Sequence, residues 1–333
     1  MVRPEKILKE LSNLWVDLGH EEQQESDTAG AGVLRACSMT FVTIADESED
    51  PSNLGETVAM LMKEHPSRSV LIRLRPCDDQ VLESRVFAQC WMPFGQRRQI
   101  CCEQIEITAS LASLDDVPGV VLPLAVADLP VILWSRSPRL FDMPAFPRIA
   151  AMCDKLILDT DAFTSEQHAF DLLSAELKGE RLVADLAWSR ITRWRETVSQ
   201  IFVNEECLNA LPSLTRVVVE YGSAKPKPEA IYLAAWLQNC LSAVGSKTHV
   251  DLLHSEGPVI SAVTLSAGGT CDVSIRSAGG GAVEVSANRL STKSFFPEPS
   301  DYLALQEELS ITRRDPAFDA AVPVASQYAR QLQ

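Results

Sequence analysis

One stretch near the middle of the chain is unusually rich in arginine and tryptophan. Trp188, Arg190, Arg193, Trp194 and Arg195 stand within eight positions. A guanidinium group is a planar fork that pairs with carboxylates or phosphates, and both residue types are enriched at binding hot spots. The stretch could therefore bind an anion or a partner protein. A second interpretation stays open, in which it is a core helix whose arginines form ion pairs within the chain.

The turn His65-Pro-Ser-Arg68 is another place where chemistry could reside. We expect Arg68, Arg73 and Arg75 on one face of the strand that follows, where they could hold an anion such as a sugar phosphate. The alternative is a rigid turn that holds Arg68 against a buried carboxylate such as Glu103 or Asp128.

Motifs of the common catalytic and cofactor classes are missing. His249, Asp251 and His254 stand close together, but no HExxH motif or Cys/His cluster accompanies them. Gly268-Gly269 and Gly279–Gly281 lie between strand patterns, where they are typical of turns and not of phosphate-binding loops. There is also no GxSxG elbow. We therefore expect no metal, no nicotinamide cofactor and no catalytic residue.

The nine cysteines are scattered, with no CxxC pair. In a chain that starts without a signal-peptide pattern they are interpreted as reduced, mostly buried thiols of a cytoplasmic protein. Cys101 and Cys102 are adjacent, and neighbours on a strand point to opposite faces. A bond between them is therefore not expected, one thiol should be buried and the other nearer solvent, and a redox role for either is a further hypothesis.

Composition limits the classes of partner. The formal net charge is −15, which argues against nucleic acid and favours a partner with a basic patch. The hydrophobic content of 46% is that of an ordinary globular protein, and no run of about 20 apolar residues predicts a membrane span.

The elements that would position these residues belong to an α/β protein of two domains, residues 1–178 and 179–333. Helix and strand patterns alternate in the first domain, and adjacent strands at 82–92 and 99–109 are expected to pair, which predicts an α/β sandwich around a mixed sheet. Three short strands with glycine turns predict an antiparallel meander in an α+β second domain. A single helix is predicted over residues 185–203.

Four motifs occur in order along the chain: His65-Pro-Ser-Arg68, Cys101-Cys-Glu-Gln-Ile105, Asp128-Leu-Pro-Val-Ile-Leu-Trp134 and Asp185-Leu-Ala-Trp-Ser-Arg-Ile-Thr-Arg-Trp-Arg195. Together they resemble the glucose-6-phosphate dehydrogenase assembly protein, or OpcA, family. The motif residues that the resemblance carries over are His65, Ser67, Arg68, Cys102, Glu103, Asp128, Pro130, Trp134, Trp188, Arg190, Trp194 and Arg195.

The resemblance implies a non-catalytic assembly factor or allosteric activator of glucose-6-phosphate dehydrogenase in the oxidative pentose phosphate pathway. The competing hypothesis is a sensor or enzyme of sugar phosphates in which Arg68, Arg73 and Arg190 hold the phosphate. A binding titration with glucose 6-phosphate distinguishes the two.

Overall fold

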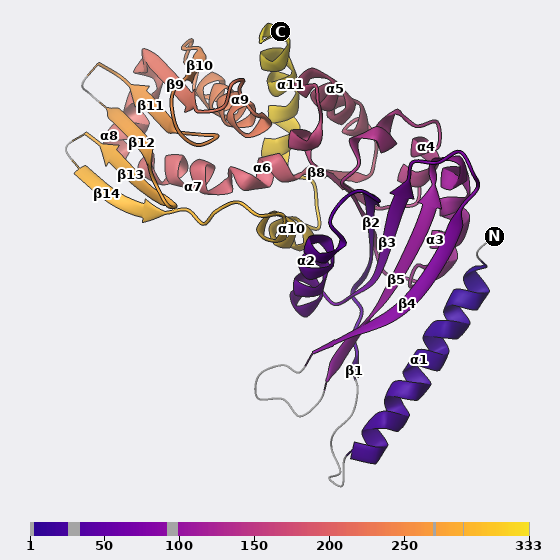
Figure 1. The fold of residues 1–333 in the computed structure, drawn as a ribbon. Coiled ribbons are helices and arrows are strands. Elements are labelled where there is room, and N and C mark those ends of the chain that lie inside the picture. The colour runs from indigo at the N-terminus through magenta and orange to yellow at the C-terminus, as the bar shows by residue number, and fades with distance from the viewer. Residues whose placement is uncertain (1–2, 26–33, 92–98, 269–270, 289, 333) are drawn as a thin grey trace. The chain divides into compact units, whose positions relative to one another are not determined.

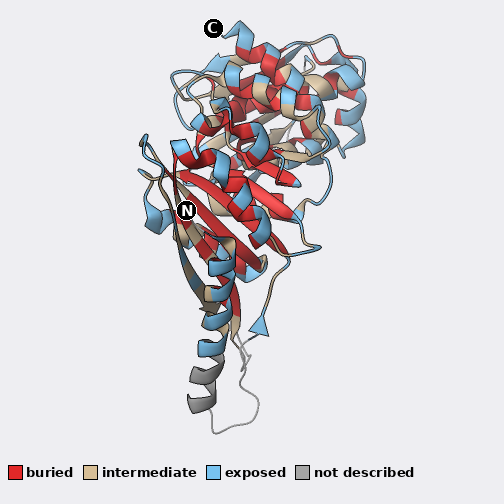
Figure 2. Cartoon of the chain, turned by 90° about the vertical axis from the view of Figure 1, so that its right-hand side faces the viewer, coloured by how far each residue is buried: buried red, intermediate tan, exposed pale blue. Residues whose placement is uncertain are grey.

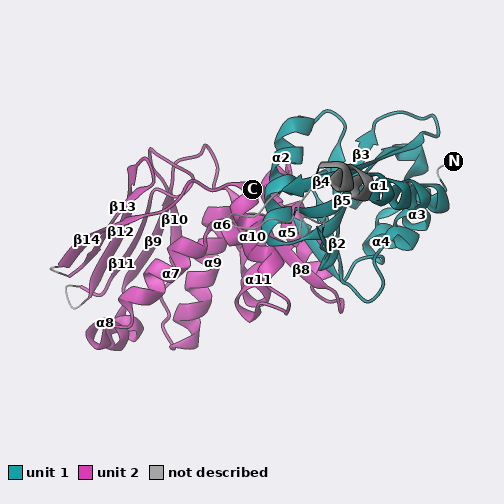
Figure 3. Cartoon of the chain, turned by 90° about the horizontal axis from the view of Figure 1, so that it is seen from below, with its two compact units in different colours: residues 1–158 teal, residues 159–333 magenta. Residues whose placement is uncertain are grey.

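The computed structural model describes residues 3–25, 34–91, 99–268, 271–288 and 290–332, with only the backbone of residues 18–25. The chain divides into two compact units, residues 1–158 and 159–333 (Figure 3). The domain boundary proposed after residue 178 stays a prediction.

Unit 1 is built around a mixed β-sheet (Figure 1). Its elements are α1 (Pro4–Glu25), β1 (Leu34–Arg35), β2 (Met39–Asp46), α2 (Pro51–Glu64), β3 (Ser67–Arg75), β4 (Leu82–Trp91), β5 (Ile100–Ser110), the 3₁₀ helix η1 (Leu111–Asp116), α3 (Val117–Leu124), β6 (Val131–Ser135), η2 (Pro138–Asp142), α4 (Phe146–Ala150) and β7 (Lys155–Leu158). The strands follow the order β1-β5-β3-β2-β6-β7 with parallel pairs, and β4 pairs antiparallel with β5. The predicted α/β sandwich around a mixed sheet is confirmed.

The central strands of this sheet are largely buried (Figure 2). Seven of the eight residues of β2 are buried, and β6 is buried throughout. A parallel sheet of this kind needs apolar side chains on both faces, which the run Met39-Thr-Phe-Val-Thr-Ile provides. Helix α2 begins where Asp50 accepts the N–H of Ser52, with Pro51 as the first helical residue.

Unit 2 combines helices with a second sheet. Its elements are η3 (Thr160–Ala162), α5 (Glu166–Glu176), β8 (Leu182–Asp185), α6 (Leu186–Arg190), α7 (Thr192–Ile201), α8 (Glu205–Ala210), η4 (Leu211–Ser213), β9 (Arg216–Tyr221), α9 (Pro228–Ala243), β10 (Val250–His254), β11 (Ala262–Ser266), β12 (Asp272–Gly279), β13 (Ala282–Ala287), β14 (Leu290–Phe295), α10 (Asp301–Ser310) and α11 (Pro316–Gln331). The sheet order is β10-β9-β11-β12-β13-β14, in which only the β10–β9 pair is parallel. The predicted antiparallel meander is confirmed, and β14 extends it.

One local expectation needs correction. The helix predicted over 185–203 is broken at Ile191, which has φ −96° and ψ 5° and donates its N–H to Trp188 O at 3.3 Å. That i→i−3 bond tightens one turn, so α7 starts afresh at Thr192. The proline-rich segment 137–148 forms η2 and the start of α4, with Pro138 and Pro147 in the first turns of these helices.

Candidate functional site

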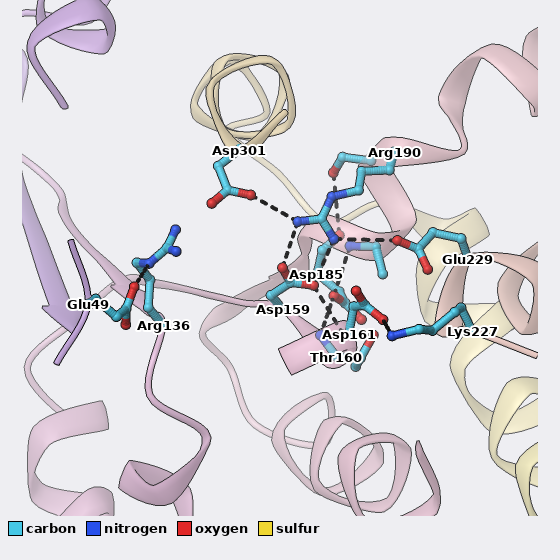
Figure 4. A network of polar contacts seen from close by, with 12 residues as sticks. Glu49, Arg136, Asp159, Thr160, Asp161, Asp185, Arg190, Lys227, Glu229 and Asp301 are labelled. Atoms are coloured by element: carbon cyan, nitrogen blue, oxygen red, sulfur yellow. Dashed lines mark hydrogen bonds and ion pairs between the residues drawn. The ribbon is translucent and has the colours of Figure 1, made fainter. Parts of the chain in front are cut away.

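Arg190 is surrounded by carboxylates of unit 2 (Figure 4). Its Nη1 and Nη2 donate to the two carboxylate oxygens of Asp159 at 2.8 and 2.6 Å. Nη2 also donates to Asp301 Oδ1 at 3.0 Å, and Nη1 lies 3.5 Å from Glu229 Oε1. The Arg190 side chain is only 12% exposed. The interpretation of an intrachain ion pair is therefore confirmed for Arg190.

A fully buried aspartate lies beside this network. Asp185 Oδ1 accepts the backbone N–H groups of Ala187 and Thr160 at 3.1 and 3.0 Å, which caps α6. Its Oδ2 accepts the Tyr232 hydroxyl at 2.7 Å. Burial, and then the charge of Asp159, raise the pKa of Asp185 to about 6. Burial, and then the charge of Asp161, similarly raise the pKa of Glu229 to about 7.

The raised pKa of Asp185 makes stability depend on pH. A carboxyl group whose pKa is higher in the folded state contributes stability below its unfolded pKa and loses that contribution as the pH rises through the folded pKa. Asp185→Asn keeps the shape of the side chain and stays neutral at every pH. Its free energy of unfolding, relative to that of wild type, should therefore increase by about 2–3 kcal/mol between pH 4 and pH 7.5. Urea unfolding followed by hydrogen exchange of unit 2 peptides, at both pH values, measures this difference.

Asp171 provides a control of opposite sign. Its hydrogen bonds with Gln167, Arg330 and Ser326 lower its pKa, with that of Gln167 as the largest cause. Asp171→Asn should therefore lose stability relative to wild type as the pH rises through the range in which Asp171 titrates. A pH-independent difference between wild type and Asp185→Asn would contradict the prediction for Asp185.

The other residues of the arginine–tryptophan stretch have different environments. The Arg195 guanidinium lies 3.8 Å from the centroid of the Trp188 ring, whose Nε1 donates to Asp315 Oδ2 at 2.9 Å. Trp194 is buried. Arg193 is 63% exposed and contacts Glu196 one turn along the same helix, at 3.0 Å. Of the three arginines, Arg193 is thus the one that faces solvent most.

A second charged cluster lies in unit 1, centred on Glu103. This side chain is 3% exposed and accepts from Arg68 Nε at 2.5 Å, Arg35 Nη2 at 2.8 Å and Trp15 Nε1 at 2.6 Å. Arg68 Nη1 donates to Leu124 O at 2.5 Å. Between the two carboxylates considered from sequence, the structure pairs Arg68 with Glu103.

The remaining motif residues of unit 1 are spread over several elements. Asp128 is exposed in the turn before β6, with φ 64°. His65 ends α2, and Ser67 is buried at the start of β3. Trp134 is buried on β6, with the Arg136 guanidinium 5.0 Å from its ring centroid. Of this motif set, Arg68 and Glu103 form an ion pair.

The expected arginine trio on β3 does not form. Arg68 is five residues from Arg73, so their side chains leave opposite faces of the strand. Arg73 Nη2 donates to Glu47 O at 2.8 Å, and the Arg75 guanidinium makes three hydrogen bonds to the Glu47 carboxylate, at 2.7–3.0 Å. These arginines hold the turn between β2 and α2, where Glu49 also binds Arg136 at 2.5 Å.

The cysteine expectations also need correction. Cys90 and Cys101 form a disulfide between β4 and β5, where they are directly paired. Cys101 and Cys102 are both fully buried, because β5 lies between β3 and β4 with most of its residues covered. Burial raises the pKa of Cys102 to about 11. A buried thiol of this kind is a poor nucleophile, so a redox role of Cys102 has no support from its environment.

The partners of Arg190 were missed in the sequence. Asp159 follows directly after β7, and an acidic residue at the carboxyl end of a buried strand is a signal that could have been noticed. Glu229 and Asp301 carried no such signal, because each stands far along the chain from Arg190. Among the described residues, no group of three or more His, Cys, Asp or Glu side chains could hold a metal ion. In the same residues, no helix has the length and apolar character needed to cross a bilayer.

Comparison with protein families decides the affiliation of the chain. Residues 58–175 match the family described as glucose-6-phosphate dehydrogenase subunit N-terminal domain, and residues 181–322 match the corresponding C-terminal domain. The chain belongs to the OpcA family of glucose-6-phosphate dehydrogenase assembly proteins. The resemblance seen in the four motifs is thereby confirmed.

Two cyanobacterial relatives carry the OpcA name and are provisionally assigned to the OxPP cycle. The protein of Nostoc punctiforme is 28% identical over 182 residues, which cover 53% of this chain and 38% of the relative. The protein of Synechocystis is 24% identical over 193 residues, which cover 57% of this chain and 39% of the relative. The match thus spans about two fifths of the length of these OpcA proteins.

Solved structures resemble the chain only in general architecture. A dehydrogenase from Chromobacterium violaceum is 11% identical with a TM-score of 0.49, over 89% of this chain and 94% of that one. The transcriptional regulator Gal80p of Kluyveromyces lactis is 8% identical with a TM-score of 0.48, over 89% of this chain and 92% of that one. At such values neither likeness carries a functional argument.

Proposed function

We propose that this OpcA-family protein binds glucose-6-phosphate dehydrogenase and raises its activity, without catalysing a reaction itself. The observation that carries the proposal is the ordered match of both family domains over residues 58–175 and 181–322. The descriptions of those domains name glucose-6-phosphate dehydrogenase, which is the partner that we propose. The proposal places the pair in the cytoplasm, at the oxidative pentose phosphate pathway.

The side chains of the motifs support a binding role over a catalytic one. Arg68 is buried and the Arg190 side chain is 12% exposed, and each of these motif arginines binds carboxylates of its own unit. Trp188 and Trp134 are buried packing residues. The turn between β2 and α2 carries three acidic residues, Glu47, Glu49 and Asp50, and no glycine, so a dinucleotide phosphate there would meet like charge.

The mechanism we propose is a population shift. A protein that binds the active oligomer of the dehydrogenase more tightly than the inactive form moves the equilibrium by its differential affinity. Equal affinity for both forms would leave the equilibrium between them unchanged. The proposal therefore requires two conformational or oligomeric states of the dehydrogenase.

Initial-rate kinetics of the dehydrogenase from the same organism test this function. We expect turnover to rise, or the apparent KM for substrate to fall, to a plateau as this protein is added. The dehydrogenase oligomer measured by light scattering should change over the same range of concentration. Unchanged kinetics and unchanged oligomeric state, with an enzyme that is fully active alone, would refute the proposal.

The sugar-phosphate hypothesis remains a second candidate with a weaker basis. Its three arginines, Arg68, Arg73 and Arg190, all have carboxylate or carbonyl partners. A calorimetric titration of the isolated protein with glucose 6-phosphate is the direct test. Saturable binding would revive this hypothesis, and it would make the sugar phosphate a candidate effector of the complex.

A further inference from the structure

A pocket with a volume of about 690 Å³ lies within unit 2. Its walls come from α7, the loop that leads into β11, the turn between β12 and β13, and the segment after β14. Trp194 and Phe296 form an aromatic wall, with ring centroids 5.3 Å apart and planes at 83°. The pocket therefore offers a surface against which a flat or aliphatic group can pack.

The arginines that line this pocket are already paired. Arg190 binds the three carboxylates described above. Arg193 binds Glu196, and Arg276 binds both carboxylate oxygens of Glu220 at 3.2 Å. None of the three is therefore an uncommitted site for an anion.

The glutamates that line the pocket are less satisfied. Glu229 is 8% exposed, and its Oε2 has no hydrogen-bond partner among the described residues. Glu256 and Glu298 are exposed at the rim, and in the part of the chain that the structure describes neither forms an ion pair. A buried carboxylate oxygen without a donor costs free energy that a bound donor would recover. The uncompensated charge in the pocket is thus negative.

We infer that this pocket receives an arginine or lysine side chain of the dehydrogenase, an inference that rests on the proposed function. The aliphatic stem and guanidinium or ammonium head would pack on Trp194 and Phe296, as basic side chains do on aromatic rings. The head would donate to Glu229 and face Glu256 and Glu298. The net charge of −15 favours an approach by a basic patch of the partner.

Binding should also depend on pH, because only ionised Glu229 attracts a cation. The charged groups that face Glu229 are Asp159, Asp161 and Asp301 as acids and Arg190 and Lys227 as bases. Burial raises the pKa of Glu229 to about 7, so affinity for the basic side chain should increase between pH 6 and pH 8. Glu229→Gln should remove this part of the pH dependence.

Binding of the whole protein to the dehydrogenase, measured by interferometry, tests the inference. Replacing both rim residues, Glu256→Gln with Glu298→Gln, should raise Kd about tenfold. The matched control is Glu205→Gln with Glu206→Gln, two exposed residues at the start of α8, which makes the same change of charge. The control should change Kd by less than about twofold. Equal Kd values for wild type, the rim variant and Glu229→Gln would overturn the inference.

A dehydrogenase that does not bind the wild-type protein would refute the proposed function separately. The pocket is then tested with N-acetyl-arginine methylamide and its neutral norleucine analogue, observed through the indole NMR signal of Trp194. Binding of the arginine compound by wild type, lost in the rim variant, supports a site for a basic side chain. No binding, or equal binding by wild type and the rim variant, overturns it.

Discussion

Arg190→Ala should destabilise unit 2 by about 3–5 kcal/mol, because it leaves buried acidic groups without their common cation. Asp159 loses two hydrogen bonds at 2.8 and 2.6 Å, and Asp301 and Glu229 lose their shared positive neighbour. Their mutual repulsion is then uncompensated in a partly desolvated site. The effect should exceed that of any exposed arginine.

Arg193→Ala is the matched control. It removes the same side chain three residues later, but Arg193 is 63% exposed and contacts only Glu196 among the described residues. Its removal should change stability by less than about 0.5 kcal/mol. Arg190→Lys should fall between the two variants, because a lysine keeps the charge but cannot bind Asp159 with two parallel hydrogen bonds.

Hydrogen exchange read by mass spectrometry is the appropriate measurement for Arg190. The chain has two compact units, so one overall unfolding energy is poorly defined, whereas exchange reports peptides of each unit separately. Protection should fall in peptides of α6, α9 and α10 for Arg190→Ala. Equal protection in Arg190→Ala and Arg193→Ala would show that the carboxylate network does not hold unit 2.

Glu103→Ala should destabilise unit 1 by a similar amount, about 3–5 kcal/mol. The substitution leaves Arg68, which is 7% exposed, without its carboxylate, and leaves the Trp15 indole N–H without its acceptor. Glu106→Ala on the same strand is the control. Glu106 is 23% exposed and lies 3.8 Å from Arg73, so its loss should cost no more than about 1 kcal/mol.

A double replacement separates the charge effect from simple loss of packing. Arg68→Met combined with Glu103→Leu removes both charges and keeps apolar volume, so its cost should be smaller than that of Glu103→Ala alone. Urea unfolding followed by the exchange of unit 1 peptides measures all three variants. A double variant as unstable as the single one would show that packing, not an uncompensated charge, dominates at this site.

Local patterns in the sequence were sufficient for much of the fold. The short apolar runs of β2 and β6 and the glycine turns of the meander predict their elements, because such patterns extend over only a few residues. The four ordered motifs were also sufficient to identify the family. The break at Ile191 was not predictable in this way, since the apolar stripe continues through it.

The candidate site was only partly predictable. The sequence offered Glu103 and Asp128 as carboxylate partners of Arg68, and the structure selects Glu103. Cys101 was assigned as a thiol because nothing local reveals that Cys90 is its directly opposed neighbour on β4. Arg190 could not be told from Arg193 by residue type, although one is buried and the other faces solvent.

The sequence by itself determined most of the secondary structure, the fold class and the family of this protein, because these depend on short-range periodicity and on motifs in order. Only the tertiary structure shows which charged side chains form ion pairs within the described chain and which do not. That difference depends on contacts such as Arg190 with Asp301, separated by 111 residues, and on burial, which sets the electrostatic cost of an unpaired charge. Among the residues that the structure describes, Glu229 Oε2 has no hydrogen-bond partner and lies in a pocket with an aromatic wall.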